Sequence, residues 1–251
     1  MFRFLARAAE RFCGIRVTRI ASENKARFSD LSVEVQEIIR RAQPYTMTSP
    51  ERVAALCLAV EHVVVNDVPG DFVECGVWRG GSSMAAAWTY ERLQKCDVDL
   101  YLFDTFSGMS EPSKEDLDAS TGKLAEELLA SSTRDSQIWA CASLEDVQSN
   151  LEKTGYPVSR LHFIQGKVED TIPSRAPDRI ALLRLDTDWY ESTNHELIHL
   201  FPRLSKNGIL IIDDYGAWAG ARKAVDEYFA ANGIRPFLNR IDGTGRILVR
   251  A

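Results

Sequence analysis

The sequence lacks the features that mark several large classes of protein. It has no apolar run near the ~18 residues that cross a membrane, and Arg and Glu interrupt its N-terminus, which makes it a poor signal peptide. A net charge of −6 leaves no excess of Lys and Arg for a nucleic-acid backbone. The five cysteines show no CxxC spacing and indicate reduced thiols. We therefore expect a cytoplasmic protein with no membrane and no nucleic-acid partner, in which a basic amphipathic helix at residues 2–13 serves docking or dimerisation.

The glycine-rich turn at residues 71–83, DFVECGVWRGGSS, lacks the GxGxxG fingerprint of dinucleotide-binding domains. Val77 and Trp78 stand where that spacing needs glycine. This weighs against a nicotinamide-dependent oxidoreductase, the alternative of a different class. Bulky Trp78 and charged Arg79 also argue against a backbone cradle for pyrophosphate, but they are compatible with a ligand that has no phosphate there.

Histidine is scarce, with four residues, yet His195 to His199 read HELIH and match the zincin pattern HExxH. A zincin needs a third ligand further along the chain, and no histidine follows His199. The motif also follows a buried strand in a parallel α/β array. Zinc proteolysis is therefore disfavoured, and we expect these side chains to line one face of a helix without a catalytic role.

The composition and the order of predicted elements indicate one large α/β domain with extra helices. The chain has 251 residues, 45% hydrophobic and 26% charged, an ordinary globular composition. Ser49 and Pro50 begin a long helix within a mostly helical segment, residues 1–68. Beyond it, strands and helices alternate and predict a doubly wound parallel sheet. Asp242-Gly243-Thr244-Gly245 indicates a closing antiparallel hairpin. The expected parallel strands are 71–75, 99–103, 161–165, 180–186 and 208–213.

Two clusters of acids follow two of these strands. IALLRLDTDWYEST (180–193) contains Asp186 and Asp188, and GILIIDDYG (208–216) contains Asp213 and Asp214. In open α/β sheets ligands bind beyond the carboxyl ends of the strands. If the two strands are neighbours, the carboxylates converge and repel one another unless a hard cation lies between them. Mg²⁺ is the expected cation.

The ends of the other strands suit an adenosine that carries an amino-acid tail. Glu74 could accept hydrogen bonds from an ammonium group, and Asp104 could bind a ribose diol. Val168 and Glu169 could flank an adenine. Together they describe S-adenosylmethionine, while the alternative for Glu74 and Asp104 is that they are solvated residues at strand ends.

Five segments resemble the macrocin O-methyltransferase family: ECGVWRGGSS, YLFDTFSGM, GKVEDTIP, LRLDTDWYEST and ILIIDDYGAWAGARKAVDEYF. That family comprises S-adenosylmethionine- and Mg²⁺-dependent enzymes of antibiotic biosynthesis that methylate sugar hydroxyls. The resemblance covers residues 45–250. It implies a class I methyltransferase (Rossmann-like) fold over residues 69–251, preceded by helices of a lid or dimerisation segment (1–68). It also implies a homodimer and a small-molecule glycoside as the acceptor.

The resemblance also assigns roles to residues. Asp186, Asp213 and Asp214 would bind Mg²⁺, and Asp188 would be the general base. An N-cap of the following helix is the alternative for Asp188. The cofactor would be held by Tyr45, Thr46, Glu74, Gly76, Gly80, Ser82, Ser83, Asp104, Ser107, Val168 and Glu169.

Two alternatives share this fold. A catechol or another vicinal diol could replace the sugar, because a metal chelates vicinal hydroxyls of either kind. A non-catalytic partner is disfavoured, because acids stand at all four positions of the two clusters.

Overall fold

The computed structural model describes residues 28–251, and residues 38–251 form one compact unit. The helix expected at residues 2–13 lies outside the described residues. Helix α3 (Val33–Ala42) and the short η1 (Gln43–Tyr45) precede α4 (Pro50–Val65). The predicted start of α4 is confirmed, because the Ser49 side chain accepts a hydrogen bond from the Arg52 N–H. The boundary after residue 68 and the homodimer stay predictions.

The predicted sheet is confirmed. Within residues 28–251 it has seven strands in the order β3-β2-β1-β4-β5-β7-β6. β1 to β5 are parallel, whereas β7 runs antiparallel to β5 and to β6 and so forms the expected terminal hairpin. The strands are β1 (Asp71–Cys75), β2 (Leu100–Asp104), β3 (Leu161–Gln165), β4 (Ile180–Leu185), β5 (Leu204–Ile212), β6 (Asn239–Arg240) and β7 (Arg246–Val249).

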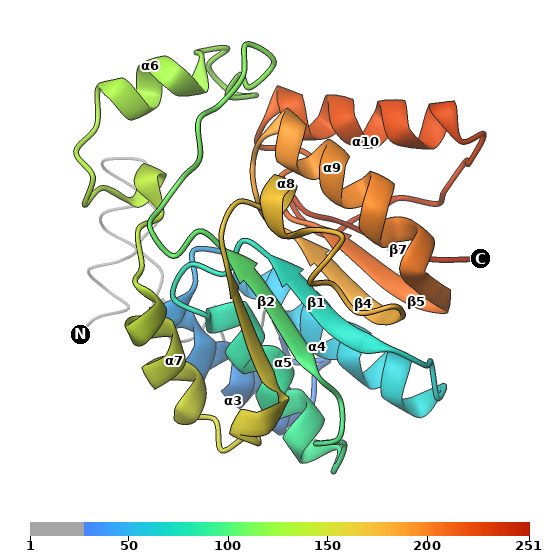
Figure 1. The fold of residues 1–251 in the computed structure, drawn as a ribbon. Helices are drawn as coiled ribbons and strands as arrows, with labels where there is room; N and C mark the ends of the chain where they lie inside the picture. Colours follow the sequence, from blue (N-terminus) through green and yellow to red (C-terminus); the bar gives the residue numbers. More distant parts are fainter. Residues whose placement is uncertain (1–27) are drawn as a thin grey trace, which may run out of the picture. The chain divides into compact units, whose positions relative to one another are not determined.

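Helices cover both faces of the sheet. Figure 1 shows α4 and α5 on one face and α8, α9 and α10 on the other. All six residues of β4 are buried, as expected for a central strand covered on both sides. The helices after β1 are α5 (Gly81–Arg92), α6 (Ala125–Ala130), α7 (Leu144–Glu152), α8 (Val168–Thr171), α9 (Tyr190–Leu200) and α10 (Ala219–Ala231). The short turns are η2 (Gln137–Trp139), η3 (Val158–Arg160) and η4 (Phe201–Arg203).

The strand order reverses direction at the centre of the sheet. β1 leads outward to β2 on one side, and β4 pairs with β1 on the other. The loops that leave these strands therefore diverge and open a crevice at their carboxyl ends. No helix within residues 28–251 has the length and apolarity to cross a membrane.

Candidate active site

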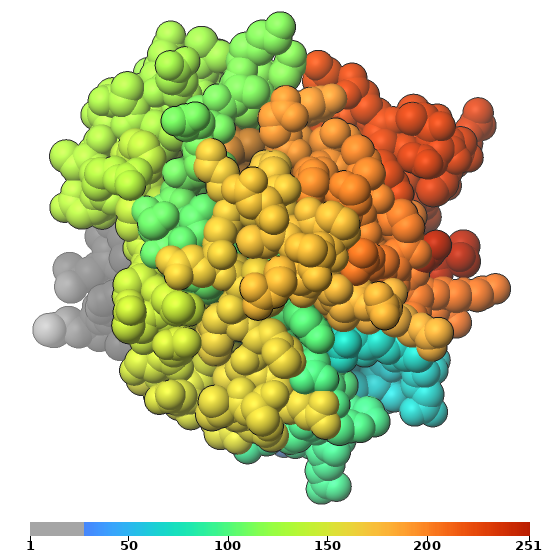
Figure 2. All heavy atoms as spheres, viewed as in Figure 1, coloured from blue at the N-terminus to red at the C-terminus, as the bar shows by residue number. Residues whose placement is uncertain are grey.

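A cavity of about 290 Å³ opens at this switch point of the sheet. The loop after β2 and the segment after β3 contribute to its lining and lie side by side on the face shown in Figure 2, where Gln165 Nε2 donates to the Thr105 carbonyl at 3.5 Å. Ten predicted site residues line the cavity: Thr46, Gly76, Ser82, Asp104, Val168, Glu169, Asp186, Asp188, Asp213 and Asp214. Five others do not line it: Tyr45, Glu74, Gly80, Ser83 and Ser107.

Gly76 brings the first turn against the end of β4. Its φ is +82°, and a Cβ atom there would lie 1.9 Å from the Asp186 carbonyl oxygen. The Gly76 N–H donates to the Phe103 carbonyl at 2.9 Å. A glycine is therefore required for the turn and the first acidic cluster to meet at the cavity.

Asp104 braces the same turn. One of its oxygens accepts hydrogen bonds from the N–H groups of Val77 at 2.7 Å and Trp78 at 3.0 Å. The other accepts the Phe106 N–H at 2.7 Å. Burial raises the pKa of Asp104, and these backbone donors oppose the rise. The structure thus shows Asp104 holding two loops, and contact with a ribose stays a prediction.

Glu74 is fully buried behind the cavity wall. Its cross-strand neighbour on β4 is Arg184, whose Nη1 donates to Glu74 Oε1 at 2.6 Å. The Ser83 hydroxyl donates to the other oxygen. Burial raises the pKa of Glu74 to about 7, although Arg184 and Ser83 pull it down. Both carboxyl oxygens of Glu74 have protein partners. Glu74 itself does not line the cavity, but its partner Arg184 does.

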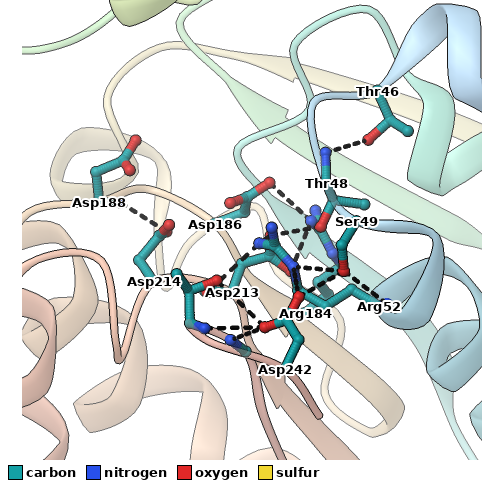
Figure 3. Close-up of polar contacts among 12 residues, drawn as sticks. Thr46, Thr48, Ser49, Arg52, Arg184, Asp186, Asp188, Asp213, Asp214 and Asp242 are labelled. Carbon is teal, nitrogen blue, oxygen red and sulfur yellow. Dashed lines mark hydrogen bonds and ion pairs between the residues drawn. The ribbon is translucent and has the colours of Figure 1, made fainter. Parts of the chain in front are cut away.

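Arg184 ties Glu74 to the two acidic clusters, as Figure 3 shows for its contacts with the aspartates. Its Nη2 lies 2.8 Å from Asp186 Oδ2 and 2.8 Å from Asp213 Oδ1. Both contacts are ion pairs without hydrogen-bond alignment. Arg52 contacts the other Asp213 oxygen, which also accepts the Thr48 hydroxyl at 2.8 Å. Sequence reasoning missed both arginines and Thr48, although the charge inside IALLRL was a signal for Arg184.

Asp188 stands apart from the two arginines. Its backbone has φ +66°, which is uncommon for a residue with a side chain and is typical of functional sites. Trp218 Nε1 donates to Asp188 Oδ1 at 2.7 Å, and the Asp188 N–H donates to Asp214 Oδ2 at 3.2 Å. Burial and then Asp186 raise the pKa of Asp188 to about 7, and hydrogen bonds of its side chain with Trp218 and Asp214 oppose the rise.

The alternative role of Asp188 as a helix cap does not hold. The N-cap of α9 is Trp189, which makes no side-chain capping bond. The N–H of Tyr190 at the start of the helix donates instead to Asp116 Oδ1 at 2.7 Å. Asp116 is fully buried and was not foreseen from the sequence.

The sequence model described as Macrocin-O-methyltransferase (TylF) matches residues 15–250. The chain belongs to this family. It is 36% identical over 209 residues to 8-demethyl-8-(2,3-dimethoxy-alpha-L-rhamnosyl)-tetracenomycin-C 4'-O-methyltransferase of Streptomyces olivaceus, covering 80% of this chain and 74% of that one. It is 33% identical over 203 residues to mycinamicin III 3''-O-methyltransferase of Micromonospora griseorubida, covering 80% and 76%. The solved structure of the O-methyltransferase NovP has a TM-score of 0.73 and 32% identity, covering 82% of each chain.

Membership of the macrocin-O-methyltransferase family confirms three predictions. The family suggested by the sequence motifs is the right one, the fold is that of class I O-methyltransferases, and the chain is an O-methyltransferase. The terminal hairpin read from the sequence agrees with that fold.

The acidic clusters offer carboxyl oxygens, the kind of ligand taken by the hard cation that the family resemblance implies, and Asp214 fits that role best. Asp214 is 8% exposed and, among residues 28–251, no Lys or Arg side chain contacts it. Burial raises its pKa well above the ordinary value, and Asp188, Asp186 and Asp213 raise it further by repulsion. A divalent cation would relieve this repulsion. No three His, Cys, Asp or Glu side chains in the described part of the chain already stand in a metal-holding arrangement, and Asp213 is engaged by the arginines.

The HELIH segment (195–199) supports the loop that carries the first acidic cluster. Glu196 is fully buried, and its Oε1 accepts the Thr187 hydroxyl at 3.0 Å. His195 Nε2 lies 3.0 Å from the Ile172 carbonyl oxygen, and its ring packs on His199 with centroids 4.4 Å apart. Since Thr187 lies between Asp186 and Asp188, Glu196 fixes the loop of the first acidic cluster.

Proposed function

We propose that this macrocin-O-methyltransferase family member transfers a methyl group from S-adenosylmethionine to a sugar hydroxyl of a glycosylated natural product. Asp186, Asp213 and Asp214 would bind Mg²⁺. The observation that carries the proposal is Asp188, a buried carboxyl group beside these acids that lines the cavity in a left-handed backbone conformation. Relatives named for O-methyl transfer in tetracenomycin and mycinamicin pathways support a glycoside as the acceptor.

The reaction forms a bond between the acceptor oxygen and the methyl carbon and breaks the bond between that carbon and the sulfonium sulfur. The proton of the hydroxyl passes to a base. Bound Mg²⁺ would supply the positive charge that makes a sugar hydroxyl easier to deprotonate. Asp188 would accept the proton, since its carboxyl group lines the cavity beside the acids that would bind the cation.

The residues around the first turn would hold the methyl donor. Gly76, Ser82 and Asp104 line one side of the cavity, and Val168 and Glu169 line the side after β3. Thr46 comes from the segment before α4. Glu74 would act behind this surface by holding Arg184 and Ser83 in place.

The test is Asp188→Asn, which keeps the shape of the side chain and removes its basicity. We expect kcat for methyl transfer to fall about 10²- to 10⁴-fold, while calorimetry shows unchanged binding of S-adenosylmethionine. Asp97→Asn is the matched control, because Asp97 pairs with Lys95 at the surface and its side chain is 65% exposed. Near-normal turnover of Asp188→Asn would remove Asp188 from the base role.

The acceptor class is tested separately by a methyl-transfer screen with glycosides and catechols. Turnover of glycosides supports the proposal, whereas turnover of catechols alone would replace it with methylation of another vicinal diol.

Calorimetry with S-adenosylmethionine and NAD, each with and without Mg²⁺, tests the cofactor. Binding of NAD alone would contradict the proposed use of S-adenosylmethionine.

A further inference from the structure

We infer that Trp218 is a positioning residue for the carboxylate of Asp188, an inference that rests on the proposed function. Trp218 is the N-cap residue of α10 and lines the cavity. Its indole Nε1 donates to Asp188 Oδ1 at 2.7 Å. The indole therefore engages one oxygen of Asp188 and leaves the other, Oδ2, for the acceptor proton.

Asp188 needs such a partner when it is ionised. Asp186 belongs to the same acidic cluster, and the Asp188 N–H donates to the Asp214 side chain, so carboxyl groups flank Asp188. Within residues 28–251, neither Arg184 nor Arg52 contacts Asp188. Without the indole N–H, the Asp188 carboxylate would lose the hydrogen bond that fixes its orientation toward the acceptor.

Trp218 is itself held on three sides. Its backbone N–H donates to the Asp214 carbonyl at 3.1 Å, and an antiparallel bridge pairs it with Asp118 in the loop after β2. The ring of Trp189 packs edge-on against it, with centroids 4.9 Å apart. Trp189 Nε1 donates in turn to the Ser110 carbonyl at 3.1 Å. The indole therefore presents its N–H in one fixed direction, as a positioning role requires.

Trp218→Phe tests the inference, because it keeps an aromatic ring and removes the N–H. We expect kcat to fall about 10- to 100-fold, as for other residues that orient a functional group. The acceptor KM and the binding of S-adenosylmethionine should change little. Trp139→Phe is the matched control: Trp139 belongs to the same aromatic cluster, and its Nε1 donates to the Ser132 carbonyl, not to Asp188.

A double-mutant cycle separates positioning from packing. In the Asp188→Asn background, Trp218→Phe should cause no further loss of kcat, because the group that it orients is no longer a base. Equal losses in both backgrounds would show that Trp218 acts through packing and would overturn the inference. A strongly impaired Asp188→Asn with a normal Trp218→Phe overturns the inference alone, whereas a normal Asp188→Asn overturns the proposed function.

A second variant keeps the inference testable if Trp218→Phe does not fold. Trp218→His retains a ring N–H, and we expect its kcat to exceed that of Asp188→Asn and to depend on Asp188. A kcat for Trp218→His that is unaffected by Asp188→Asn would overturn the inference.

Discussion

Replacing Arg184 with methionine should lower the free energy of unfolding by more than the replacement of an arginine at the surface. The Arg184 side chain is 3% exposed and contacts three carboxylates, those of Glu74, Asp186 and Asp213. Methionine fills much of the volume but leaves these charges without their shared partner. Removing one member of a buried ion pair costs about 3–5 kcal/mol, because the remaining charge is buried and uncompensated. Arg52 still contacts Asp213, but no second arginine among residues 28–251 directly contacts Glu74 or Asp186.

We therefore expect Arg184→Met to lose about 4–5 kcal/mol of unfolding free energy. For a protein of this size, that corresponds to a fall in Tm of about 8–20 °C. Urea denaturation followed by circular dichroism measures the loss. The deficit should shrink as the pH is lowered from about 7.5 to about 5.5, because protonation removes the uncompensated charge.

The control is Arg92→Met. Arg92 pairs with Glu61, and their side chains are 27% and 30% exposed. A partly exposed pair of this kind contributes about 0–1 kcal/mol, well below the cost expected for Arg184. If Arg184→Met loses no more unfolding free energy than Arg92→Met, or if its loss does not depend on pH, the buried guanidinium does not stabilise the fold by compensating these carboxylates.

Three further outcomes are expected. Gly76→Ala should lose at least about 2 kcal/mol of stability and bind S-adenosylmethionine poorly, whereas Gly122→Ala, at φ +69° with nothing within 4 Å of the added Cβ, should lose about 1 kcal/mol by urea denaturation. Without metal, burial raises the folded-state pKa values of Glu74 and Asp188 to about 7, so their contribution to stability is full below their ordinary pKa values and is lost as the pH rises through about 7. The Tm in EDTA should fall across that range, and a rising Tm would contradict the assignment. Added Mg²⁺ should raise Tm more at high pH than at low pH, because ionised carboxylates bind it.

The sequence was sufficient to predict the features that depend on neighbouring residues. The apolar run before Asp186 identified a buried strand, and Ser49 with Pro50 identified the start of α4. The acids that follow β4 and β5 were placed at one edge of the sheet, where the structure has them. These signals are local, because strand period, capping and turn chemistry act over a few residues.

The contacts between strands were not predictable in the same way. Glu74 was expected to contact the methyl donor, yet its oxygen Oε1 accepts a hydrogen bond from Arg184, the cross-strand partner. Finding the pair requires knowing that β1 and β4 are neighbours and in which register. Arg52 lies even further in sequence from Asp213, and Trp218 follows Asp188 by 30 residues, so only the folded chain brings each of them to the acid that it contacts.

The distribution of positive charge divides the acids into two groups. Arg184 contacts Asp186 and Asp213, and Arg52 contacts Asp213 again, so the protein compensates these carboxylates itself. In the part of the chain that the structure describes, the donors to Asp188 and Asp214 are neutral N–H groups, from Trp218 and from the Asp188 backbone. The carboxyl groups without a cationic partner among the described residues are therefore those of Asp188 and Asp214, where the proposed reaction requires a proton acceptor and a bound cation. An extra arginine at this position would stabilise the fold but would remove the charge that the proposed chemistry uses.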